Sequence, residues 1–299
     1  MFSALARTTR GAAVALCGLA LTAAPACPVK AQSARPGPAA SPAPPDVERT
    51  FRPTVIVRHD GAQGSGTVIA SVAGETLVLT ASHVVGPPGS GPLTVELHRY
   101  NLGVEGKLPA EGWPVAWPAE LAATDPSADV AVVRVRGQRP LPFVARLASA
   151  GHEPRRGTTV VSLGVDGGER LSSWVTRVVE TSWFSMAADD PAASGPFRVE
   201  ARPRGRWGEP AAAPVGRDER TFLLTARAPR SGRSGGGLFD TRGMLVGLCV
   251  GRIEGGVDRG RGLFASVESA RALLREHRLD DAVSRSERLH APAVARPVR

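Results

Sequence analysis

The sequence predicts an all-β protein that folds into two six-stranded antiparallel β-barrels and ends in one helix. About a dozen short runs of apolar or β-branched residues are each bounded by Gly, Pro, Asp or Ser, the pattern of strands joined by turns. Gly and Pro are abundant, at 34 and 26 of 299 residues, and aromatic residues make up only 5% of the chain. A pause near residues 137–152 divides the runs into two sets, and closing each set into a barrel leaves no edge strand exposed.

The first 31 residues have the order of segments found in a secretory signal. Arg7 and Arg10 precede a short apolar stretch at residues 11–24, and Val29-Lys30-Ala31 forms a small-x-small cleavage pattern. The apolar stretch is too short to cross a bilayer as a stable helix. We therefore expect a signal peptide at residues 1–31, export to the periplasm or the medium, and no transmembrane anchor.

Cleavage of the signal also decides which of the three cysteines the mature chain keeps. Cys17 and Cys27 leave with the signal, so the mature chain keeps only Cys249 and forms no intrachain disulfide. Cleavage after Ala26 would instead leave Cys27 first, as in a lipoprotein, although the residues before it lack the Leu that such signals usually carry. Cys249 lies in an apolar run, which favours a buried structural thiol over a Cys nucleophile.

The body of the chain divides into a linker and two barrels. Residues 32–50 form a linker rich in Pro and Ala, a composition that cannot bury enough apolar surface to order itself. The first barrel is expected in residues 51–140, and the second barrel with the helix in residues 141–280. The expected strands are Thr54–Val57, Gly66–Ser71, Thr76–Thr80, Leu93–His98, Ala119–Thr124, Val130–Val135, Thr158–Leu163, Leu171–Glu180, Phe197–Ala201, Phe222–Ala226, Met244–Val250 and Gly262–Ser266.

Three further segments complete the predicted organisation. The helix begins at Ser266, which can cap it, continues with an apolar stripe at helical spacing, and ends near His277–Leu279. Residues 281–299 are basic and contain Pro, which predicts a disordered tail. The weakly patterned stretch Asp189–Arg220 is long for a loop, so we expect either a mobile surface insertion or a lid near the site.

Charge and composition exclude some classes of function. The net charge is +9, but the basic residues are scattered, without a run or an aromatic-basic alternation, so we expect no nucleic-acid partner. The six histidines show no metal-ligand spacing with Cys or acidic residues. Gly64-x-Gly66 opens a strand and not a helix, which argues against a nucleotide site. No metal and no cofactor is implied.

Three segments carry residue types suited to nucleophilic catalysis. His83 follows an apolar strand, Asp129 precedes another, and Ser234 lies inside a glycine-dense turn. A Ser hydroxyl is a poor nucleophile near neutral pH and needs an adjacent base, and a His base needs a carboxylate to fix its tautomer. The order His, Asp, Ser along the chain is that of the chymotrypsin type of triad. Main-chain N–H groups of Gly232 and Ser234 are the expected donors of an oxyanion hole.

These residues and their neighbours resemble the trypsin-like serine proteases, and most closely the HtrA/Deg branch without its PDZ domain. The resemblance implies two perpendicular barrels with the active site between them, His83 as general base, Asp129 as its orienting carboxylate and Ser234 as nucleophile. It also implies polypeptide substrates, unfolded or damaged proteins among them, and a homo-oligomer, a trimer. The matching stretches are Gly64–Ile69, Thr80–Val85, Ala119–Asp125, Asp129–Val132, Gly232–Gly236 and Gly262–Ala265.

The chain departs from this family at several positions. Arg233 stands where the family usually has Asp or Asn, and we expect its bulky cation to alter the rim of the site. By the resemblance, Ala228 lies at the base of the substrate pocket beside Arg230. No acidic floor for Arg or Lys is visible, so a small or medium apolar side chain is expected there, or an acidic one drawn by Arg230.

Two other hypotheses stay open from the sequence. One is a catalytically inactive trypsin-like fold that acts as a protein-binding module, favoured by Arg233 and by the insertion at Asp189–Arg220. The other is a basic protein that binds nucleic acid, for which steep salt dependence of DNA binding would be diagnostic. The intact His, Asp and Ser set favours an exported serine endopeptidase over both.

Overall fold

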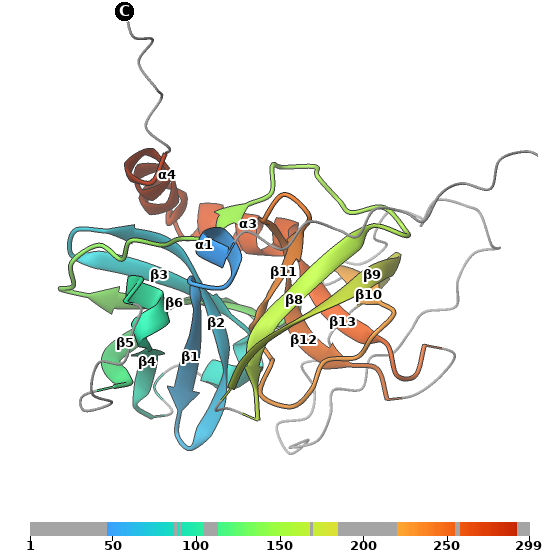
Figure 1. Cartoon of the computed structure of the whole chain (residues 1–299), viewed down its shortest axis with the longest axis horizontal. Helices are drawn as coiled ribbons and strands as arrows, with labels where there is room; N and C mark the ends of the chain where they lie inside the picture. Colours follow the sequence, from blue (N-terminus) through green and yellow to red (C-terminus); the bar gives the residue numbers. More distant parts are fainter. Residues whose placement is uncertain are drawn as a thin grey trace, which may run out of the picture. The chain divides into compact units, whose positions relative to one another are not determined.

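The strands of this chain close into two antiparallel barrels, as the sequence analysis predicts (Figure 1). The structure is a computed structural model that describes residues 47–86, 89, 91–104, 113–167, 170–184, 220–254 and 258–291. The predicted signal peptide, nearly all of the linker and most of the Asp189–Arg220 stretch lie outside the described residues. In the part of the chain that is described, no helix is long and apolar enough to span a membrane.

The first barrel closes in the order β1-β2-β3-β6-β5-β4. Asp60 and Gly61 both have positive φ angles, 43° and 79°, and join β1 to β2 where His59 pairs with Ala62. This is the Asp-Gly chemistry of a two-residue hairpin turn, whose twist matches that of the strands. The elements of this half are α1 (Val47–Thr50), β1 (Thr54–His59), β2 (Ala62–Val72), β3 (Glu75–Thr80), α2 (Ser82–Val85), β4 (Leu93–Leu97), η1 (Arg99–Leu102), β5 (Val115–Asp125) and β6 (Val130–Arg136).

The second barrel closes in the order β11-β8-β9-β10-β13-β12, with β7 added to β12 as a short parallel strand. Phe222, Phe239 and Phe264 are fully buried in its core. The elements are β7 (Arg146–Leu147), β8 (Thr159–Asp166), β9 (Arg170–Phe184), β10 (Arg220–Thr225), β11 (Gly237–Asp240), β12 (Met244–Arg252), β13 (Gly262–Ser266), α3 (Val267–Glu276) and α4 (Asp280–Leu289).

Strand β11 completes the second barrel, and the sequence analysis missed it. It spans only Gly237–Asp240, directly after the glycine-rich turn, and pairs with both β8 and β12. The strand expected at Phe197–Ala201 lies outside the described residues. Because β11 is so short and follows so many glycines, its sequence has no strand pattern of its own.

The C-terminal helix is present and a second helix follows it. Helix α3 is capped by Ser266, whose side chain accepts a hydrogen bond from the Glu268 N–H, as predicted. The prediction of a disordered tail from residue 281 is wrong for α4, which packs against β2 of the first barrel (Figure 1). The Ser71 N–H donates to Ser286 Oγ at 2.8 Å, and both side chains are fully buried. Small buried residues on an otherwise charged helix gave too weak an apolar stripe to read from the sequence.

Candidate active site

His83 and Asp129 are in direct contact through two hydrogen bonds. Asp129 Oδ2 lies 2.8 Å from His83 Nδ1, and Asp129 Oδ1 accepts from the His83 main-chain N–H at 2.9 Å. The Asp129 side chain is 3% exposed and that of His83 is 27% exposed. A buried carboxylate on Nδ1 orients the ring and fixes which of its two nitrogens carries the proton in the neutral form.

The fold of the first barrel brings these two residues together. Strand β3 runs beside β6, with Thr80 opposite Ala131, so the turn after β3 meets the turn before β6. The Ser82 N–H donates to the Asp129 carbonyl at 3.2 Å, a third bond between the two turns. Asp129 has φ 54°, a left-handed conformation that Asp tolerates better than most residues. The carboxylate is therefore fixed by main-chain geometry as well as by its partner.

Ser234 lies in the tight turn that leads into β11. Its hydroxyl donates to the Val250 carbonyl at 3.3 Å, and the next N–H, that of Gly235, donates to the Cys249 carbonyl at 2.7 Å. Gly235 has φ 81°, and a Cβ there would overlap the Ser65 carbonyl and the Thr80 hydroxyl. Only glycine fits such a position, because it combines a left-handed conformation with close approach of other chain segments.

The turn that contains Ser234 and the turn that contains His83 meet at strand β2. The Ser65 N–H donates to the Ser234 carbonyl at 2.7 Å, which ties the second barrel to the first. A Cβ on Gly64 would lie 2.6 Å from a methyl of Val84, the residue after His83, and 2.8 Å from the Ser234 carbonyl. Gly64 therefore lies close to both turns, although His83 and Ser234 are far apart in the sequence.

The main chain around Ser234 turns two N–H groups away from internal partners. The Ser231 carbonyl accepts from the Gly167 N–H at 2.9 Å, and the Arg233 carbonyl accepts from the Gly236 N–H at 2.8 Å. In a trans peptide the N–H points opposite to the carbonyl, so these bonds orient the N–H groups of Gly232 and Ser234. Within the described residues, neither of these two N–H groups donates a hydrogen bond. Both remain available to an oxygen atom of a bound molecule.

Comparison with known proteins decides the family. The sequence model of the trypsin-like peptidase domain matches residues 64–248. The chain belongs to this family. The chain is accordingly a serine endopeptidase by family, and its fold is the trypsin-like one.

Several solved structures share the trypsin-like fold of this chain. The Rv3671c protease in its inactive form is 24% identical, with 80% of this chain and 98% of that chain covered and a TM-score of 0.53. A serine-to-alanine mutant of Rv3671c from M. tuberculosis H37Rv, also in an inactive form, is 25% identical over 81% and 97%, with a TM-score of 0.53. A serine endoprotease from Yersinia pestis is 18% identical over 79% and 66%, with a TM-score of 0.52. No curated protein sequence matches the chain.

The Arg233 side chain of this trypsin-like peptidase does not lie where its sequence predicts. We expected its side chain at the rim of the site, but it is fully buried, with 0% of its surface exposed. It points into the second barrel and pairs with Asp166 at 2.8 Å. Sequence reasoning also missed Asp166, because nothing local marks which carboxylate neutralises a buried guanidinium.

The two residues predicted to shape the substrate pocket differ in exposure. Ala228 is half-buried, next to the buried Pro229, and Arg230 is exposed. Arg230 also borders a cavity of about 650 Å³ that Asp166, Leu171 and Ser231 line. The exposed Arg230 side chain can therefore contact a bound molecule.

Cys249 is the buried thiol that the sequence analysis expects. Its side chain is fully buried, and burial raises the pKa of the thiol above its usual range. Its main-chain N–H donates to the Gly236 carbonyl at 2.8 Å, so Cys249 also helps to hold the turn that follows Ser234. A thiol that is both buried and protonated is a poor nucleophile.

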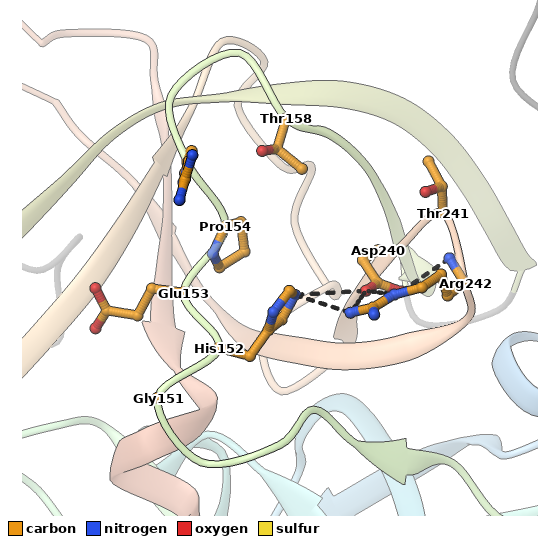
Figure 2. A pocket seen from close by; sticks show the side chains of 9 residues that line it. Gly151, His152, Glu153, Pro154, Thr158, Asp240, Thr241 and Arg242 are labelled. Atoms are coloured by element: carbon orange, nitrogen blue, oxygen red, sulfur yellow. Dashed lines mark hydrogen bonds and ion pairs between the residues drawn. The ribbon is translucent and has the colours of Figure 1, made fainter.

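A second hollow of about 580 Å³ lies on the second barrel, and neither His83 nor Ser234 is among the residues that line it (Figure 2). His152 and Arg242 point toward Asp240 in it, and Arg242 pairs with Asp240 at 2.9 Å. Because Asp240 is buried and also accepts the N–H groups of Arg242 and Met244, this cluster fixes the turn after β11. In the described part of the chain, no group of three or more His, Cys, Asp or Glu side chains is arranged to hold a metal ion.

The hydrogen bonds of Asp125 should make the stability of this trypsin-like peptidase depend on pH. Burial alone would raise the pKa of Asp125, but hydrogen bonds from Ser127 and from Arg220, which lies 2.9 Å away on β10, lower it below the usual 3.8. A lowered pKa in the folded state stabilises the fold above the usual pKa, and this stabilisation is lost as the pH falls through the lowered value. We expect Asp125→Asn to reduce the free energy of unfolding by about 1 kcal/mol at neutral pH, since the pair is partly solvated.

Urea unfolding at several pH values checks this prediction. The difference between wild type and Asp125→Asn should shrink from about pH 5 downward. Asp60→Asn, at an exposed turn residue, is the matched control and should show no such trend. A difference of constant size down to the lowest pH at which both proteins fold would contradict the assignment.

Proposed function

We propose that this chain is an exported serine endopeptidase that cleaves unfolded or damaged polypeptides through Ser234, His83 and Asp129. The observation that carries the proposal is the double contact of Asp129 with the ring and the main chain of His83, at 2.8 and 2.9 Å. A buried carboxylate that binds one histidine in this way holds the ring in the orientation and tautomer that a general base needs. The resemblance of the matching stretches to the HtrA/Deg branch supports the choice of substrate class.

Each residue then has a defined part in acyl transfer. Ser234 Oγ attacks the scissile carbonyl carbon while His83 Nε2 takes the hydroxyl proton, and Asp129 stabilises the resulting imidazolium. The N–H groups of Gly232 and Ser234 donate to the oxyanion. His83 gives its proton to the leaving amine, and an acyl-enzyme remains on Ser234. Water deprotonated by His83 hydrolyses that ester and releases the second product.

The surroundings of Ser234 support a substrate preference. Ala228 and Pro229 offer no acidic partner for a Lys or Arg side chain, so a small or medium apolar residue fits best beside the scissile bond. The exposed Arg230 is placed to favour an acidic residue near it. Export rests on the signal-like order of residues 1–31.

Fluorophosphonate labelling of the purified chain tests the proposal. We expect the wild type to be labelled at a single site, with the adduct mapped to Ser234 by mass spectrometry, and Ser234→Ala to remain unlabelled. An unfolded, carboxymethylated protein and its folded form are then offered as substrates, and the unfolded form should be cleaved faster. A folded wild type that takes no label at any pH between about 6 and 9 would refute the enzymatic role. The fold would then act as a binding module.

A further inference from the structure

The residue directly before the nucleophile is the largest fully buried side chain of the described structure. Two nitrogens of the Arg233 guanidinium, Nε and Nη2, donate to Asp166 Oδ1 at 3.0 and 2.8 Å. Nη1 donates to the Ser162 carbonyl at 3.0 Å and to the Ser172 carbonyl at 3.3 Å. The guanidinium thus has partners on three sides, as a buried charge requires.

These partners belong to one hairpin. Ser162 and Asp166 lie on β8, Ser172 lies on β9, and β8 pairs with β9 along the whole of its own length, from Thr159 to Asp166. Ser172 Oγ accepts from Arg233 Nη2 and donates to Asp166 Oδ2 at 2.5 Å, so it links cation and carboxylate. The ring of Trp174 lies 5.4 Å from the guanidinium carbon and covers it. A paired hairpin is a rigid support compared with a loop.

The main chain and the stem of Arg233 are held as firmly as its guanidinium. Its N–H donates to the Arg230 carbonyl at 3.3 Å and its carbonyl accepts from the Gly236 N–H at 2.8 Å. The stem packs on β8, where a Cβ on Gly164 would lie 2.7 Å from Arg233 Cγ. One peptide bond separates this anchored residue from Ser234, so a displacement of the guanidinium moves the nucleophile and the N–H beside it.

We infer that the Arg233–Asp166 ion pair holds the nucleophile turn, residues 231–235, in its reactive conformation. This inference rests on the proposed function, and it makes Arg233 and Asp166 positioning residues for Ser234. The pair holds the turn from β8 of the second barrel, whereas Asp129 orients His83 in the first barrel. The alternative is that the pair only stabilises the second barrel, as the pair of Asp240 with Arg242 does at 2.9 Å.

Asp166→Asn is the variant that tests this inference. The Asp166 carboxylate is 19% exposed and borders the cavity of about 650 Å³, so an amide and a water molecule can be accommodated there. The change leaves Arg233 without its counter-charge. We expect kcat for a peptide substrate, and the rate of fluorophosphonate labelling, to fall by about 10²-fold, the size of effect that a small misplacement of a reacting group produces. KM should change little, because substrate contacts are not removed.

Asp240→Asn is the matched control. Asp240 is another carboxylate of the second barrel with an Arg partner, and it lies at the far end of β11 from Ser234. Both variants should lower the urea midpoint of unfolding, but only Asp166→Asn should lower kcat. If the folded Asp166→Asn protein is labelled at the wild-type rate, the inference is wrong and the pair is merely structural.

Two further measurements keep the inference testable if Asp166→Asn does not fold or if the wild type takes no label. Ser172→Ala keeps both charges and removes the hydroxyl that links them, and a folded Ser172→Ala protein with wild-type kcat would overturn the inference. Amide hydrogen exchange of the peptide covering residues 231–236 reports the turn without any activity. Exchange there should be faster in Ser172→Ala than in wild type and unchanged in Asp240→Asn. Equal exchange in all three proteins would also overturn it.

Discussion

Ser234→Ala is expected to lower kcat for peptide hydrolysis by about 10⁶-fold, and adding His83→Ala to lower it no further. Ser234 and His83 act on the same proton, so removing either one removes the nucleophilic route as a whole. What remains is the contribution of the oxyanion donors and of substrate binding, which neither change removes. Steady-state kinetics of both single variants and the double variant measure this directly.

The control for these variants is a Ser→Ala change elsewhere. Ser284 is exposed on α4, and Ser284→Ala should keep wild-type kcat and KM. The kcat of the double variant decides between coupled and independent roles of the two residues. If the losses of the two single variants multiply, Ser234 and His83 act independently, and the assignment of one as nucleophile and the other as its base fails.

Asp129→Asn is expected to lower kcat by about 10⁴-fold near neutral pH while the protein stays folded. The structure gives the reason, because Asp129 Oδ2 faces His83 Nδ1 at 2.8 Å and Oδ1 accepts the His83 N–H at 2.9 Å. An Asn can keep the second bond with its carbonyl oxygen. Its NH₂ group would then face Nδ1, which must become an acceptor and places the ring proton on Nε2. A protonated Nε2 cannot take the proton of Ser234.

Asp125→Asn, four residues earlier in the same turn region, is the matched control for Asp129→Asn. Its carboxylate pairs with Arg220 at 2.9 Å, so its loss should lower the stability at neutral pH and leave kcat within a few-fold. Both variants are compared at equal folded fraction, measured by urea unfolding. Equal kcat for Asp129→Asn and wild type would show that the carboxylate does not orient the base.

The local pattern of the sequence was enough for the first barrel. Strands β1, β3 and β6 each contain a run of β-branched or apolar residues, and the Asp60-Gly61 pair forms a hairpin turn with positive φ at both positions. In such segments, propensity, alternation and turn chemistry all favour one structure, so each can be read without its neighbours. The same holds for the capped helix α3 after Ser266.

The elements that were missed depend on distant partners. Strand β11 is only four residues long and exists because β8 and β12 lie on either side of it. Helix α4 is mostly charged, and the buried faces of Ala282, Val283 and Ser286 are too small to mark it. Its stability comes from packing against β2, which a helix of this length needs in water. Neither feature leaves a periodic signal.

The candidate site also has a part that the sequence predicted and a part that only the structure showed. Residue types and their order along the chain were sufficient to predict His83, Asp129 and Ser234, because acyl transfer needs a base, its carboxylate and a hydroxyl. Only the tertiary structure decided that Arg233 turns inward, since its partner Asp166 is 67 residues away and any of several carboxylates would have served. The sequence by itself thus determined which groups carry the chemistry. The packing of β8 and β9 decided how the nucleophile is held, because a buried charge must be matched by whatever the folded chain brings within hydrogen-bond distance.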